Sequence, residues 1–314
     1  MLNRRLIRVK ALQAVYAYYQ SEVKDKKSAR SFLKKSILGV EDTFINILQF
    51  ADDLFQFIKL KYNPADQHLD AKREKVLNFD LLSKNLCLEL LINNSKTSSL
   101  FNKPSYNWVR DEDFLFLIYR QISESDWLKN TNLEAGENFE TDKQFLLQLY
   151  KYLVETSEDF NIKMEEINIH WQDEKIPVLK SVEKLVKSCN EDGSSIDIPP
   201  LSKDLEDDLS YSEKLLDLSI NNHVQCEELI SKRAPEWDPE RIARLDLYIM
   251  IMALTEFMEF PNIPVKVTIN EYLELAKIYS TPQSSKFING ILDNLLNELK
   301  KENRIKKTGR GLVE

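Results

Sequence analysis

Basic residues crowd the start of the chain in a pattern suited to binding phosphate. Arg4, Arg5, Arg8 and Lys10 fall within the first ten residues, where no acidic residue occurs. A helix that begins after Asn3 would carry Arg4 and Arg8 on one strip of its surface. Cations at a helix start meet the positive end of the helix dipole, so folding alone would favour acids there. Because guanidinium groups grip phosphate or stack on bases, we predict an RNA-binding strip.

A second segment suited to RNA runs from Ser280 to Ile291 and contains no acid. It places Lys286, Phe287 and Asn289 near the start of the last expected helix. Free amides at a helix start attract phosphate, lysine adds charge, and asparagine can read a base edge. Phe287 has two interpretations, since it either packs in the core or stacks on a base.

Catalytic and metal-binding motifs do not emerge from the sequence. His68, His170 and His223 lack the spacing of a zinc site, and the three cysteines are scattered and odd in number. The six glycines form neither a phosphate-binding loop nor a nucleophile elbow. We therefore expect a protein that is not an enzyme and needs neither cofactor nor metal.

Charge is divided unevenly along the chain. The net charge is −8, but residues 1–10 carry +4 and residues 299–313 carry +5, which leaves −17 for the rest. Beyond about 10 Å charges are largely screened, so two basic ends can bind RNA locally. The alternative is that neither basic end binds RNA: the helix start is simply solvated and the tail is frayed.

The longest apolar run, Leu247 to Leu254, is too short to cross a bilayer, and no export signal is apparent. We expect a cytoplasmic protein without membrane contact.

Apolar residues recur at helical spacing throughout, which predicts an all-α fold. A long apolar stripe covers 33–58, and residues 190–203 are the clearest linker. Short connections near the end predict a compact bundle, whose last helix we expect Ser284 to cap. The first helix is expected to start after Asn3 and to place an apolar face from Leu6 to Tyr19. The other helices are expected near 76–92, 112–123, 143–155, 178–189, 205–232, 239–260 and 265–279.

Two sequence motifs near the end of the chain, in the same order as in the family, resemble the NusB family of bacterial antitermination factors. Residues 263–277 read IPVKVTINEYLELAK, close to the family's iPxKvaINEaielAK, and residues 285–293 read SKFINGILD, close to sxKFvNGvLd. Trp237, Arg241-Ile242-Ala243 and Asp246 resemble the family's W…RiaxxD helix, and residues 3–16 its arginine-rich first helix. The family's aLYE reads Ala253-Leu254-Thr255-Glu256, so a threonine replaces the usual tyrosine.

The resemblance implies an all-helical bundle of two packed subdomains that binds boxA RNA, a single-stranded element of ribosomal RNA leader transcripts. The family acts with NusE, a small-subunit ribosomal protein, and helps the transcribing RNA polymerase resist termination. Carried over by position, the resemblance makes Glu256 and Thr255 candidates for the NusE contact. The RNA-contact candidates are Arg4, Arg5, Arg8, Lys10, Lys286, Phe287 and Asn289.

The resemblance covers only the two ends of the chain. We expect residues 1–22 and 205–302 to form the NusB-like RNA-binding domain, residues 23–203 a helical insertion of unknown role, and residues 303–314 a disordered basic tail. The insertion and Thr255 also motivate an alternative, a helical protein-protein scaffold that has lost RNA recognition. An RNA methyltransferase would need a glycine-rich turn for its cofactor, for which the glycines leave no place.

Overall fold

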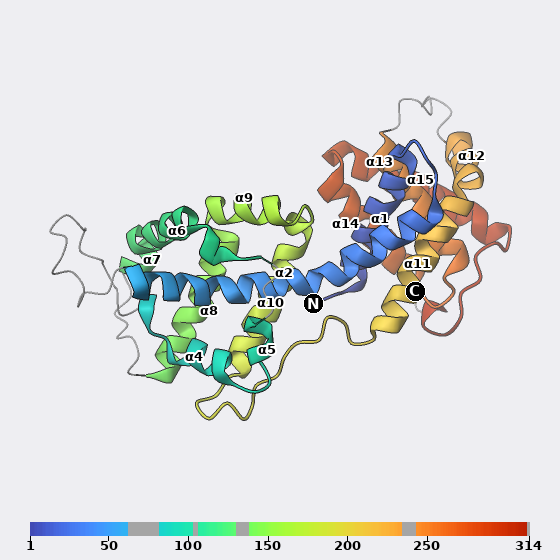
Figure 1. Ribbon diagram of the computed structural model, residues 1–314. Coiled ribbons are helices and arrows are strands. Elements are labelled where there is room, and N and C mark those ends of the chain that lie inside the picture. The colour runs from blue at the N-terminus through green and yellow to red at the C-terminus, as the bar shows by residue number, and fades with distance from the viewer. Residues whose placement is uncertain (62–81, 103–105, 130–137, 234–242, 313–314) are drawn as a thin grey trace, which may run out of the picture. The chain divides into compact units, whose positions relative to one another are not determined.

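The computed structural model describes residues 1–61, 82–102, 106–129, 138–233 and 243–312 (Figure 1). Every regular element in these ranges is a helix, which confirms the all-α prediction. No helix in this part of the chain combines the length and apolar composition that a bilayer crossing requires. Residues 62–66 and 234–242, which include Trp237, Arg241 and Ile242, lie outside the described ranges.

The chain divides into two compact units. The central unit comprises Met1 and residues 38–201, and the terminal unit comprises residues 2–37 and 202–314. Helix α2 (Lys26–Lys61) contributes to both. Counted along the sequence, the central unit carries a net charge of −11 and the terminal unit +3. The acidity of the whole chain therefore belongs to the central unit, and the unit built from both ends is the cationic one.

The central unit is built around an aromatic core. Phe50 of α2 lies with its ring centroid 4.9 Å from those of Trp108 and Phe160. The buried indole nitrogen of Trp108 donates to the Asn46 carbonyl at 3.0 Å, which satisfies its one polar atom. Around α2 lie α4 (Leu86–Asn93), α5 (Ser98–Phe101), a 3₁₀ turn (Trp108–Arg110), α6 (Glu112–Glu124), α7 (Asp126–Lys129), α8 (Phe139–Glu155), α9 (Glu158–Ile167) and α10 (Trp171–Ser188).

Helix α13 (Arg244–Glu259) is the core helix of the terminal unit. Its residues from Tyr248 to Phe257 are all buried, as expected for a helix that neighbours surround on every side. The neighbours that pack on it are α1 (Arg4–Gln20), α11 (Leu205–Asn221), α12 (His223–Arg233), α14 (Val265–Tyr279) and α15 (Pro282–Lys301). The Asn3 side chain accepts from the Leu6 amide at 2.8 Å, so the predicted N-cap of α1 is confirmed.

Several predicted boundaries need correction. The helix expected over 205–232 is two helices, because α11 ends at Asn221 and α12 begins at His223. Thr281, not Ser284, caps α15: its hydroxyl accepts from the Ser284 amide at 3.2 Å, and Pro282 occupies the first turn. Residues 190–203 form no helix, in line with the predicted linker.

The C-terminal tail differs from the predicted disorder, since residues 303–312 are folded against the turn between α13 and α14. The Lys307 amine donates to the carbonyls of Glu256 at 3.3 Å and Phe260 at 2.9 Å. The amide of Thr308 donates to the Pro261 carbonyl at 3.0 Å. The carbonyls of Glu256 and Phe260 also accept from the amides of Phe260 and Ile263, so Lys307 adds a second donor to each at the end of α13.

Candidate nucleic-acid interface

A fully buried carboxylate, that of Glu256, organises the interior of the terminal unit. It accepts hydrogen bonds from Arg8 Nε at 2.9 Å and from Arg8 Nη2 at 2.7 Å. The hydroxyls of Tyr211 and Thr268 donate to it at 2.7 Å, and that of Tyr272 at 3.3 Å. Its charge is thus matched by a bidentate guanidinium and by three hydroxyls from α11 and α14.

Arg8 is fixed by this arrangement and is 2% exposed. Burial alone would lower the pKa of Arg8, but the hydrogen bonds and charge of Glu256 raise it above its usual range. Burial likewise opposes ionisation of Glu256, yet the bonds from Arg8, Tyr211 and Thr268 hold the pKa of this carboxyl below its usual value. Both groups remain charged and joined, so the pair connects α1 to α13 inside the protein.

Four of the predicted contact residues therefore lie in the interior, which corrects their expected placement. Arg8 and Lys10 are 2% and 0% exposed, and Thr255 and Glu256 are 0% exposed. None of these side chains is accessible to RNA or to a protein partner in this conformation. The cause is that α1 packs on both α11 and α13, and α13 is itself surrounded by neighbouring helices.

Arg4 and Arg5, by contrast, reach the surface of the unit. The guanidinium of Arg4 lies 4.2 Å above the ring of Tyr211, pairs with Asp207, and places Nε 3.4 Å from Asp208. Its Nη1 has no acceptor among the described residues. Arg5 donates two hydrogen bonds of 3.0 Å to Glu271, which raise its pKa. Carboxylates thus hold both arginines in position.

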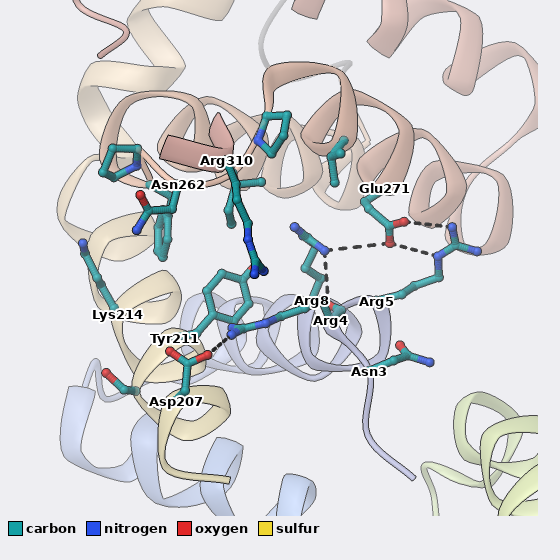
Figure 2. Close-up of a pocket in the computed structure, with 16 residues that line it drawn as sticks. Asn3, Arg4, Arg5, Arg8, Asp207, Tyr211, Lys214, Asn262, Glu271 and Arg310 are labelled. Atoms are coloured by element: carbon teal, nitrogen blue, oxygen red, sulfur yellow. Dashed lines mark hydrogen bonds and ion pairs between the residues drawn. The ribbon is translucent and has the colours of Figure 1, made fainter. Parts of the chain in front are cut away.

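A pocket of about 1220 Å³ opens beside these two arginines, entirely within the terminal unit. Figure 2 shows Arg4, Arg5 and Arg310 around it, with Arg310 extending toward Tyr211. Five of its lining residues are cations and two are acids, so positive charge is in excess. The lining residues are Asn3, Arg4, Arg5, Arg8, Asp207, Ser210, Tyr211, Lys214, Phe260, Pro261, Asn262, Ile263, Pro264, Val267, Glu271 and Arg310.

The second predicted segment lies on the first turns of α15, outside the pocket lining. Lys286 is exposed, and Phe287 is partly buried against the core. The Asn289 amide donates to Asp293 at 3.3 Å. Because only Ser280 and Thr281 connect α14 to α15, these turns run back along the end of α14. Lys286 is therefore presented near the helix whose Glu271 and Glu274 hold Arg5.

Among the pocket residues absent from the sequence-based candidates, Arg310, Tyr211 and Lys214 bear most on its chemistry. Arg310 belongs to the basic tail, whose charge suggested that it can bind RNA but did not indicate where the tail would lie. Tyr211 and Lys214 come from α11, and no local pattern distinguishes them from other helical residues. Their positions follow from the packing of α11 against α1 and α13, which spacing in the sequence does not reveal.

The described residues include no cluster of histidine, cysteine or acidic side chains that could hold a metal ion. Cys87, Cys189 and Cys226 are all buried free thiols, as their scatter in the sequence suggested. The chemistry that this surface offers is therefore that of guanidinium, ammonium and aromatic groups.

Fold and site together define a helical bundle with a cationic pocket beside its first helix. Comparison with known proteins adds that a sequence profile of the NusB family matches residues 178–297. A transcription antitermination protein NusB of Koribacter versatilis is 41% identical over 105 residues, which are 33% of this chain and 72% of the relative. The chain belongs to the NusB family, as its motifs indicated.

Two further relatives are described as transcription antitermination protein NusB. That of Salinibacter ruber is 40% identical over 103 residues, 33% of this chain and 64% of the relative. That of Chloroherpeton thalassium is 43% identical over 101 residues, 32% of this chain and 48% of the relative. The chain thus spans just under two thirds of the first of these two proteins and just under half of the second. No solved structure matches the chain.

Proposed function

We propose that this chain is a transcription antitermination factor that is not an enzyme and binds boxA-type single-stranded RNA together with NusE. Through that complex it would help RNA polymerase to continue transcription. The observation that carries the proposal is the pocket of the terminal unit, where Arg4, Arg5, Lys214 and Arg310 face two acids, and Arg8 beneath them is neutralised by Glu256. Phosphate contacts depend on this local excess of positive charge and not on the net charge of the chain.

The proposed RNA contacts are the predicted residues that reach the surface. Arg4 and Arg5 flank the pocket, and Lys286 with Phe287 and Asn289 extends the path along α14 to the start of α15. Arg8 and Lys10 support this surface from beneath without touching RNA, since both are buried. Glu256 and Thr255 are likewise internal, so NusE would contact other residues of the unit.

Titration of fluorescein-labelled boxA-type RNA by anisotropy, with and without NusE, tests the proposal. We expect tighter binding when NusE is present, and binding that weakens as salt rises by about 0.7 log units of affinity per log unit of salt for each phosphate contacted. Absence of binding under both conditions would contradict the proposal.

A double variant, Arg4→Gln with Arg5→Gln, assigns the site. It should weaken RNA binding while the helical circular dichroism stays unchanged, because both arginines are surface groups. Arg233→Gln is the matched control: Arg233 also forms an exposed ion pair, with Glu298, but does not line the pocket. Equal losses in the two proteins would mean that the pocket is not the RNA site.

One observation favours the alternative of a protein-binding scaffold. Arg4 and Arg5 are already paired with Asp207, Asp208 and Glu271 of the same unit, so RNA phosphates would have to compete with these carboxylates. A scaffold would recover the same proteins from a cell extract before and after nuclease treatment, and no crosslinked RNA. The proposed factor would recover crosslinked RNA that nuclease removes.

A further inference from the structure

The folded tail delivers a cation to the pocket. Lys307 and Thr308 bind carbonyls at and after the end of α13, and the Thr308 hydroxyl lies 3.2 Å from Asn262 Oδ1. Gly311 packs so closely that a Cβ there would lie 1.9 Å from the Pro261 carbonyl oxygen. These contacts fix the backbone on both sides of Arg310, which lines the pocket together with Arg4 and Arg5.

Arg310 differs from the other pocket arginines in having no acidic partner among the described residues. Arg4 is paired with Asp207 and Arg5 with Glu271, whereas Arg310 is exposed and forms no ion pair with any residue in those ranges. Lys214 is the other cation of the pocket that pairs with no acid of the described residues. It donates to the Glu259 carbonyl at 3.2 Å and lies over the Phe260 ring. The pocket thus contains two positive charges that its own acids do not neutralise.

We propose that Arg310 is an RNA-contact residue and that the docked tail, residues 303–312, forms one wall of the RNA site. This inference rests on the proposed function, since it names a further part of the same site. The turn on which the tail docks adds Pro261, Ile263 and Pro264 to the same wall, an apolar surface against which the face of a base can lie. Arg310 and Lys214 then meet the phosphates on either side of that nucleotide.

The chemistry of the pocket favours single-stranded RNA over an acidic peptide. A base has a flat apolar face and an adjacent phosphate, which match an apolar wall beside a guanidinium group. An acidic peptide would use the cations but leave the partly exposed Pro261, Ile263 and Pro264 uncovered. The RNA therefore accounts for both surfaces of the pocket.

Three variants of the full-length chain test the inference in the anisotropy titration. Arg310→Ala removes the contact, and we expect affinity to fall about tenfold at low salt, as for a hydrogen bond to a charged group. The salt slope should fall by about 0.7, the value for one phosphate on a single strand. Lys306→Ala is the matched control, since it removes one exposed cation of the same tail that does not line the pocket.

Gly311→Ala separates the docking of the tail from its charge. The added methyl group cannot fit against Pro261, so the tail must leave its place although no charge is lost. We expect its affinity to fall like that of Arg310→Ala, with the helical circular dichroism retained. Wild-type affinity in Gly311→Ala would overturn the role of docking.

The outcomes separate this inference from the function on which it rests. RNA binding by the wild type with equal affinities for Arg310→Ala and Lys306→Ala overturns the tail contact and leaves the proposed function standing. A wild type that binds no RNA, with or without NusE, overturns the proposed function itself. If Arg310→Ala reduces binding of NusE in the absence of RNA but leaves RNA affinity unchanged, the tail is a protein contact and the inference is wrong.

Discussion

Replacing Glu256 by glutamine tests whether the buried ion pair holds the terminal unit together. The substitution preserves the size of the side chain but removes its charge and replaces one acceptor oxygen by a donor, so Arg8 loses the carboxylate to which it is hydrogen-bonded. Arg8 has no other carboxylate at hydrogen-bonding distance, because the nearest oxygen of Glu271 lies 3.8 Å from its Nη1. Glu271, which is also paired with Arg5, therefore offsets only part of the lost charge.

The expected loss follows from the burial of both partners. Removing one member of a buried pair typically costs about 3–5 kcal/mol, because the other charge stays desolvated. Arg8 is 2% and Glu256 0% exposed, so the pair falls in that class. Against a typical domain stability of about 5–15 kcal/mol, such a loss leaves the unit folded but much more often open.

Hydrogen exchange measured by mass spectrometry suits this test, because peptides from α1 and α13 report the terminal unit alone. A loss of about 3–5 kcal/mol corresponds to exchange faster by a factor of about 100 to 5000 where exchange follows opening. Peptides from α8 and α10 should change little. A global measurement would mix the two units, so it would not isolate this loss.

Glu298→Gln is the matched control, since Glu298 forms an ion pair with Arg233 at the surface. Exposed pairs contribute about 0–1 kcal/mol, so this variant should exchange almost like the wild type. If Glu256→Gln behaved like Glu298→Gln, the buried pair would not stabilise the unit and the argument for Arg8 as a structural residue would be wrong.

Three further outcomes follow from the pKa shifts. As pH falls below about 4.5, the terminal unit of the wild type should lose stability, because the folded-state pKa of Glu256 is lowered and the unfolded state binds more protons. The exchange protection of α1 and α13, corrected for the intrinsic exchange rate at each pH, should fall less in Glu256→Gln. Burial lowers the pKa of Lys307 to about 8, so at that pH its amine should be acylated faster than its exposure predicts. The docked tail should also gain stability as pH rises from about 8, because the undocked tail then binds more protons. Slow labelling of Lys307 at every pH would contradict the docking. Burial raises the pKa of Cys226 to about 11, so iodoacetamide should modify this thiol only after unfolding, and rapid native labelling would contradict its burial.

Local signals explain which elements could be predicted from the sequence. Asn3 before α1 and Pro264 before α14 set helix starts through backbone geometry that depends only on neighbouring residues, whereas Pro282 in the first turn of α15 makes Thr281 the cap in place of the predicted Ser284. The break at Asn222 could not be predicted, because neither glycine nor proline marks it and the helical pattern continues across it. The short-range chemistry of capping was therefore more informative than apolar periodicity alone.

The candidate site was harder to predict because burial depends on distant partners. Arg4 and Arg8 are the same residue type one turn apart, and the sequence assigns them the same role. Only the fold shows that Arg8 meets Glu256, 248 positions away, while Arg4 lies over Tyr211 at the surface. The cationic ends were recognisable from charge, but which arginine is buried and which reaches the surface was not.

The buried pair of Arg8 and Glu256 also affects RNA binding through the surface arginines next to it. Because Arg8 anchors α1 to α13, it fixes the rotation of α1 about its axis and so the direction in which Arg4 and Arg5 point. Arg8→Lys keeps the charge but loses the planar two-bond contact with Glu256. We expect it to lower both the exchange protection of α1 and the affinity for boxA-type RNA, whereas Arg5→Gln should lower affinity alone. Reduced protection with unchanged affinity in Arg8→Lys would show that the surface arginines find their RNA contacts without the buried anchor.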